Sequence, residues 1–189
     1  MMNAFNYIDG LNGLCASFSL VCLTSIIAIV NAFNSPNLLP LILPAGAIVG
    51  FLMYNLGIFG DQRNVFLGDN GSQALGFLCL WILVYFSQFD SYGFSPVTAL
   101  WLVAILFMDA VRVLLTRIIS GLRGSNIFKA KRDHIHHKLQ DYGFSNELVY
   151  SVLILSTVSL SALGIFLNRI FLESHYYSFY TFIILWICF

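Results

Sequence analysis

Three of the four histidines in this 189-residue chain stand within four positions of one another, beside a basic run. His134, His136 and His137 follow Lys131 and Arg132 in the stretch KAKRDHIHHKLQ. If this segment is helical, His134 and His137 share one face, because residues three apart are neighbours on a helix. Basic side chains, with imidazoles as further hydrogen-bond donors, are suited to an anionic ligand.

Other interpretations of the histidine stretch remain open from the residues alone. A zinc site is one, although no cysteine lies close by and no carboxylate stands at the required helical spacing. Binding to anionic lipid headgroups is another, but it requires only positive charge and leaves the clustered imidazoles unexplained. A metal-ion transporter is disfavoured, since its histidines are expected inside membrane spans and not in a basic loop.

A second polar group lies near the N-terminus, in the stretch NAFNYIDGLNGL. Asn3, Asn6, Asp9 and Asn12 recur at every third position. Their amide and carboxylate oxygens suit a hard cation or sugar hydroxyls, and the glycines that follow Asp9 and Asn12 allow a ligand close to the backbone. A capped, polar helix start is the structural alternative. Four such residues in register favour a functional role.

A third polar group is centred on Asp69, in the stretch VFLGDNGSQALGF. Asp69 stands between Gly68 and Asn70, and Gly71 and Ser72 then open an apolar run. A turn of small residues at a helix N-terminus exposes backbone N–H groups that suit a phosphate. Asp69 could hold Mg²⁺ against that phosphate. A plain capped turn explains this stretch equally well when it is taken by itself.

The composition indicates that membrane helices position these polar groups. Hydrophobic residues make up 59% of the chain and charged residues 10%, whereas soluble domains are nearer half apolar and a quarter charged. So few charges cannot cover a surface that faces water, and we therefore expect the lipid bilayer to be the solvent. The formal net charge is +0, and we expect no nucleic-acid partner.

Six apolar runs approach the roughly 20 residues that a helix needs to cross a bilayer, although the last is short. Lipid requires every backbone polar group to be satisfied within the protein, which helices achieve. We therefore predict an all-α integral membrane protein with about six transmembrane helices, forming a single membrane domain over residues 1–189. The runs are Leu11–Ala32, Leu38–Leu56, Ser72–Phe86, Pro96–Leu115, Leu148–Leu167 and Tyr176–Phe189.

The charged residues predict the orientation in the membrane. Alternating spans place the N-terminus and the loops 57–71 and 117–147 on one side, and only Arg169 among the loop cations falls on the other. Lys and Arg are retained in cytoplasmic loops, so we expect all three polar groups in cytoplasmic active-site loops of an inner-membrane, multi-pass protein. Asp109 and Arg112 lie inside a span three residues apart, and we expect a neutralising pair.

The order and spacing of these motifs resemble the polyprenyl-phosphate N-acetylhexosamine-1-phosphate transferases of glycosyltransferase family 4. The stretches that carry the resemblance are NAFNYIDGLNGL, VFLGDNGS, MDAVRVLLTRIISG and KRDHIHHKLQDYGF. The HIHH form of the histidine motif is typical of the branch that transfers GlcNAc-1-phosphate to undecaprenyl phosphate, and not of the muramyl-pentapeptide branch. The resemblance covers residues 3 to about 167. No single motif is specific, but the combination is.

The resemblance implies a reaction and roles for individual residues. A lipid phosphate, undecaprenyl phosphate, attacks a UDP-N-acetylhexosamine, which the HIHH branch implies to be UDP-GlcNAc, with Mg²⁺ or Mn²⁺ as cofactor, and UMP leaves. The product begins a lipid-linked cell-envelope polysaccharide. The roles carried over are metal binding for Asp69, catalysis for Asp9, His134, His136 and His137, and substrate binding for Asn6, Asn12, Asn55, Phe66 and Arg132.

Two departures from the family pattern concern Asn12 and the start of the chain. Bacterial members usually carry an aspartate at the position of Asn12, which cannot act as a base but can hydrogen-bond a nucleobase or sugar. Members also have further spans and a paired-aspartate motif before the asparagine-rich stretch. We therefore expect a C-terminal portion of such an enzyme, inactive when purified alone and joined by an N-terminal half or a second copy. The alternative is a non-catalytic membrane fragment or partner subunit that binds lipid phosphate or UDP-sugar.

Overall fold

A computed structural model describes residues 2–32, 38–60, 65–88, 94–122, 133–171 and 175–189. These residues form nine α-helices and contain no strand. The predicted all-α fold is confirmed. The helices are α1 (Met2–Ile8), α2 (Leu14–Ala32), α3 (Leu39–Asn55), α4 (Gly68–Ser87), α5 (Pro96–Leu102), α6 (Ala104–Leu122), α7 (Ile135–Asp141), α8 (Asn146–Ile170) and α9 (Tyr176–Cys188).

The predicted number of about six spans is too high for the described residues. Three helices are long and apolar enough to cross a membrane: α2, α4 and α8. The run Pro96–Leu115 does not form one straight helix, because α5 and α6 meet at an angle of 83° and count together as at most a fourth, broken span. The apolar helices α3 and α9 contain 17 and 13 residues, fewer than the roughly 20 that a bilayer requires.

Helix α2 lies at the centre of the bundle and packs against α3, α4 and α8. Its buried face carries Leu14, Phe18 and Leu23. The fit between α5 and α8 depends on a glycine, since a Cβ at Gly164 would lie 2.2 Å from the Cβ of Trp101. Small residues let membrane helices approach closely. The cysteines, which we interpreted as small buried hydrophobes, are free, and all but Cys188 are buried.

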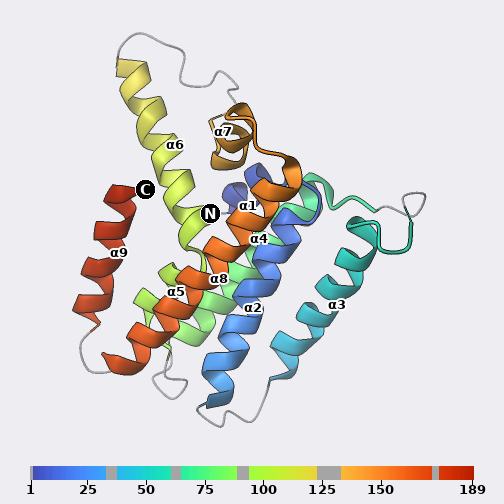
Figure 1. The fold of residues 1–189 in the computed structure, drawn as a ribbon. Helices are drawn as coiled ribbons and strands as arrows, with labels where there is room; N and C mark the ends of the chain where they lie inside the picture. The colour runs from blue at the N-terminus through green and yellow to red at the C-terminus, as the bar shows by residue number, and fades with distance from the viewer. Residues whose placement is uncertain (1, 33–37, 61–64, 89–93, 123–132, 172–174) are drawn as a thin grey trace.

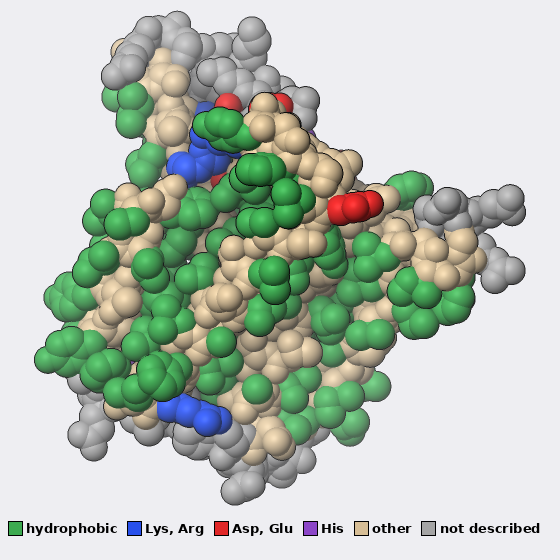
Figure 2. Space-filling view, in the orientation of Figure 1, with side chains coloured by type: hydrophobic (Ala, Val, Ile, Leu, Met, Phe, Trp, Pro, Cys, Tyr) green, Lys and Arg blue, Asp and Glu red, His purple; other side chains and the backbone are tan. Residues whose placement is uncertain are grey.

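The bundle has two polar ends separated by an apolar middle. Figure 1 shows α1, α7 and the first turns of α2, α4 and α8 at its upper end, which we call the α7 end. The start of α5, the last turn of α8 and the first turn of α9 lie at the lower end, the α5 end. Figure 2 shows hydrophobic side chains over the middle of the visible face, with Lys, Arg, Asp and Glu only near its two ends. This distribution is that of a membrane protein.

A candidate phosphoryl-transfer site at the α7 end

The asparagine-rich stretch near the N-terminus and the stretch around Asp69 line one cavity. It has a volume of about 240 Å³ and lies between the α1–α2 turn, the last residue of α3 and the first turn of α4. The turn that follows α1 and the turn that precedes α4 face each other because α1 packs along α4. Five of the predicted site residues come together here: Asp9, Asn12, Asn55, Phe66 and Asp69.

The carboxyl group of Asp9 lies near that of Asp69 in this cavity. Burial, followed by the negative charge of Asp69, raises the pKa of Asp9 from 3.8 to about 6. A carboxyl group with a perturbed pKa in a cavity is typical of a functional site. A divalent cation between the two carboxylates would remove the repulsion that contributes to this shift.

The cavity fits Mg²⁺ better than a metal held by protein alone. The described residues contain no group of three or more His, Cys, Asp or Glu side chains that could enclose a metal ion. Mg²⁺ is commonly bound by one or two carboxylates, with water and substrate phosphates completing its coordination. Asp9 and Asp69 can supply the carboxylates, and the amide oxygens of Asn12 and Asn55 line the same space.

Asn55 offers this cavity a buried hydrogen-bond acceptor. The side chain is only 4% exposed, and its Nδ2 donates to the carbonyl oxygen of Val65 at 2.6 Å. Since a carbonyl can only accept, this bond fixes which end of the amide is nitrogen. The Oδ1 atom then has no hydrogen-bond partner among the described residues. A buried polar atom without a partner is rare in proteins and indicates a missing ligand or water.

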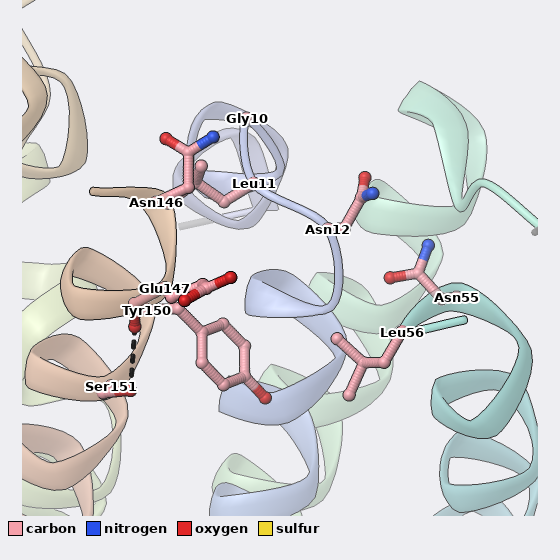
Figure 3. Close-up of a pocket in the computed structure, with 9 residues that line it drawn as sticks. All are labelled: Gly10, Leu11, Asn12, Asn55, Leu56, Asn146, Glu147, Tyr150 and Ser151. Atoms are coloured by element: carbon pink, nitrogen blue, oxygen red, sulfur yellow. Dashed lines mark hydrogen bonds between the residues drawn. The ribbon is translucent and has the colours of Figure 1, made fainter. Parts of the chain in front are cut away.

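A larger pocket of about 520 Å³ adjoins the first and shares Leu11, Asn12 and Asn55 with it. Its opposite wall is the first turn and a half of α8, where the tyrosine OH of Tyr150 lies 2.7 Å from Ser17 Oγ on α2. Figure 3 shows side chains of the α1–α2 turn, the end of α3 and the start of α8 around this space, with the oxygen of Asn55 toward its middle. The α8 residues that line it were missed by sequence reasoning: Asn146, Glu147, Tyr150 and Ser151.

The histidine motif packs against the asparagine-rich turn. His136 is fully buried, and a Cβ at Gly10 would lie 2.7 Å from its Nε2, so only glycine allows this approach. The ring of His134 stacks on Tyr7 with centroids 4.9 Å apart. The rings of His136 and His137 lie 4.0 Å apart. The histidine motif and the asparagine-rich stretch are therefore in direct contact at the α7 end.

Four predicted site residues within the described part of the chain line neither cavity, namely Asn6, His134, His136 and His137. Asn6 is half-buried on α1 and does not line either cavity described above. Arg132 lies outside the described residues. Asp109, which we expected only to neutralise Arg112, does form that pair with an N···O distance of 2.5 Å. It also contacts His134 at 2.8 Å, so it lies closer to the histidine motif than the sequence indicated.

Comparisons with known proteins agree with this geometry. Residues 1–87 match the model of glycosyl transferase family 4. The undecaprenyl-phosphate alpha-N-acetylglucosaminyl 1-phosphate transferase of Escherichia coli K12 is 36% identical over 166 residues, which are 87% of this chain and 44% of that protein. The enzymes of the same name from Yersinia pestis and Salmonella typhi are 31% and 34% identical, over 46% and 44% of their lengths. This chain thus spans less than half the length of these relatives, and it is similar to glycosyl transferase family 4 over residues 1–87.

Proposed function

We propose that this chain acts in the transfer of N-acetylglucosamine-1-phosphate from UDP-GlcNAc to undecaprenyl phosphate. An oxygen of the lipid phosphate attacks the β-phosphorus of the nucleotide sugar. The bond from that phosphorus to the bridging oxygen breaks, and UMP leaves with the electron pair. The lipid then carries a diphosphate-linked sugar, which begins a lipid-linked cell-envelope polysaccharide.

One observation carries the proposal: residues from three separate segments line one cavity, and the histidine motif packs against the asparagine-rich segment that contributes to it. Two substrates bring several negative charges together, so the transfer depends on positioning and electrostatic stabilisation. Asp9 and Asp69 are the residues that would hold Mg²⁺, which supplies neutralisation of the diphosphate charge when bound. The asparagine amides and the exposed ring of Phe66 are available to the nucleotide part.

The proposed membrane arrangement follows from the same site. UDP-sugars are made in the cytoplasm, and the Lys and Arg bias supports a cytoplasmic α7 end. Single cysteines at Gln140 and at Tyr92, in a background without the four native cysteines, can be treated in whole cells with an impermeant reagent. We expect Tyr92→Cys to react and Gln140→Cys to remain protected. The reverse result would put the site on the wrong side for its donor.

Transfer of labelled GlcNAc-1-phosphate to undecaprenyl phosphate tests the reaction itself. Membranes should contain this chain either alone or together with the N-terminal half of a related enzyme, which supplies a paired-aspartate motif. We expect UMP release and labelled lipid in the combined membranes, and at least about tenfold less of both products when Asp69→Asn is introduced. The absence of labelled lipid from both preparations of the unaltered chain, despite normal insertion, would contradict the proposal.

The alternative is a non-catalytic protein that binds lipid phosphate or UDP-sugar. The observation in its favour is that the described residues bring only two carboxylates to the cavity. Equilibrium binding of UDP-GlcNAc to the combined membranes, without any labelled lipid over many hours, would support this alternative.

A further inference from the structure

The contacts of Asp109 exceed those of a neutralising ion pair. This residue lies on α6 and is 5% exposed, and both of its carboxylate oxygens are engaged. Oδ1 accepts from Arg112 Nη2 at 2.5 Å and from the backbone N–H of Ile135 at 3.1 Å. Oδ2 lies 2.8 Å from Nδ1 of His134. One carboxylate therefore connects α6 to the residue before α7 and to the first residue of α7.

Arg112 adds a further connection at the same place. Its Nη2 donates to the backbone oxygen of Asp133 at 2.7 Å, while it also pairs with Asp109. Three consecutive residues, 133 to 135, are thus held to one turn of α6. The pair fixes the position of the histidine motif relative to α6, a role that charge neutralisation alone does not require.

The Asp109 carboxylate also determines which nitrogen of His134 carries a proton. An ionised carboxylate can only accept hydrogen bonds, so the facing Nδ1 must be the donor. Nε2 is then the acceptor of the neutral ring, or a second donor when the ring is protonated. The stack with Tyr7 at 4.9 Å restrains the plane of the same ring.

We infer that Asp109 is a positioning residue that fixes His134 in its Nδ1–H tautomer and presents Nε2 to the phosphates. This inference rests on the proposed function for the identity of the ligand. Its structural part, the tautomer and its cause, stands independently. A group that orients an imidazole in this way sets both the direction and the chemistry of the free nitrogen.

The variant Asp109→Asn tests the tautomer directly. The oxygen of the amide should take the place of Oδ1, because the two donors there, Arg112 and the Ile135 N–H, cannot become acceptors. The NH₂ group then faces His134, whose ring can relieve the conflict by moving its proton to Nε2. ¹⁵N chemical shifts of histidine in the labelled full chain should therefore report Nδ1–H in the wild type and Nε2–H in the variant. An unchanged tautomer would overturn the inference without bearing on the reaction.

Two His134 variants separate the functions of its nitrogens. His134→Asn keeps a donor near the Nδ1 position and loses Nε2, whereas His134→Gln keeps a group near Nε2 and loses the donor to Asp109. In membranes active for transfer, Asp109→Asn and His134→Asn should each lower kcat roughly 100-fold, the low end for a lost proton-transfer or donor group, with KM changed less than about threefold. Because both act through one imidazole, the double variant should be no slower than His134→Asn.

Asp133→Asn is the matched control. It removes a neighbouring carboxylate whose side chain pairs with Arg117 at 3.5 Å, whereas that of Asp109 pairs with His134. We expect its kcat to stay within about twofold of the wild type. Equal losses in Asp133→Asn and Asp109→Asn, or multiplicative losses in the double variant, would show that Asp109 does not act through His134. If Asp109→Asn does not insert into the membrane, the kcat of His134→Asn provides the test. A wild-type kcat in His134→Asn would refute a role for Nε2.

Discussion

The two ends of the bundle both bury polar side chains, but they satisfy them in different ways. At the α5 end, Ser95 Oγ lies 2.9 Å from Thr98 Oγ1, which in turn donates to Asn168 Oδ1 at 2.7 Å. Trp101 donates to Ser178 Oγ at 3.0 Å in the same region. These bonds join α5 to α8 and α9. Each of these polar groups has another protein group as its partner.

At the α7 end, polar groups outside the bonded Asp109 and His134 pair face open space. Asn55 Oδ1 has no protein partner among the described residues, and Asp9 has a raised pKa beside a second carboxylate. Polar groups within a membrane protein that bond one another stabilise helix packing. Polar groups that face a cavity cost stability unless a ligand engages them. The comparison separates a structural polar network from a binding site made of similar residue types.

The largest expected difference between the ends is catalytic. Asp69→Asn keeps the side-chain size and removes one cavity carboxylate, so transfer should fall at least about tenfold, equivalent to 1.36 kcal/mol of lost transition-state stabilisation. Turnover of labelled sugar phosphate at saturating Mg²⁺ is the measurement, made in the combined membranes. Near-wild-type turnover would remove Asp69 from the metal site.

A change at the α5 end should lower stability and leave transfer unchanged. Thr98→Val keeps the shape but removes the hydroxyl that bridges Ser95 and Asn168, so the free energy of unfolding should fall by about 1 kcal/mol, as for other hydrogen bonds within membranes. Thermal unfolding in detergent measures this loss, and transfer at 25 °C should remain unchanged. Lost turnover with unaltered stability would mean that this end also takes part in the reaction.

The smallest expected effect concerns Asp9 and pH. Its pKa is raised in the folded state, so the fold favours the protonated carboxyl, and stability should fall as pH rises from about 4 through about 6. Asp9→Asn cannot ionise, so its stability should not fall in this way as pH rises. In Mg²⁺-free buffer the variant should therefore melt slightly above the wild type at pH 7 and level with it near pH 4.

Added Mg²⁺ should reverse the order of these melting temperatures, because the cation stabilises only the chain with both carboxylates. Asp141→Asn, at the exposed end of α7, is the control and should follow the wild type under all conditions. An Asp9→Asn variant less stable than the wild type at pH 7 without Mg²⁺ would show that Asp9 is not held near another negative charge.

The sequence predicted those parts of the site that depend only on the alternating direction of successive helices. Hydrophobic runs of alternating direction place Asp9, Asp69 and His136 at one end, and the structure brings them there. The 83° bend between α5 and α6 was missed because neither glycine nor proline marks it. Its cause is tertiary: Trp101 and Val103 are buried, with Trp101 packed on Gly164 of another helix.

The α8 wall of the larger pocket was also beyond prediction from sequence. Glu147 and Tyr150 follow Ser145, which accepts from the Leu148 N–H as an ordinary helix cap, so the stretch resembles a plain polar helix start. Only the packing of α8 against α2 turns these side chains toward Asn12. The contact between Asp109 and His134 depends likewise on a fold-back across 25 residues of chain.

The distribution of bound Mn²⁺ around the four histidines tests most directly whether the α7 end holds one metal and phosphate site. His134, His136 and His137 lie at this end, and His175 precedes α9 at the other. With Mn²⁺ in place of Mg²⁺, the ¹⁵N and ring-proton signals of the first three histidines should broaden, while those of His175 stay sharp. Asp69→Asn should abolish the broadening. Equal broadening of all four histidines, or broadening that persists in Asp69→Asn, would contradict a metal site between Asp9, Asp69 and the histidine motif.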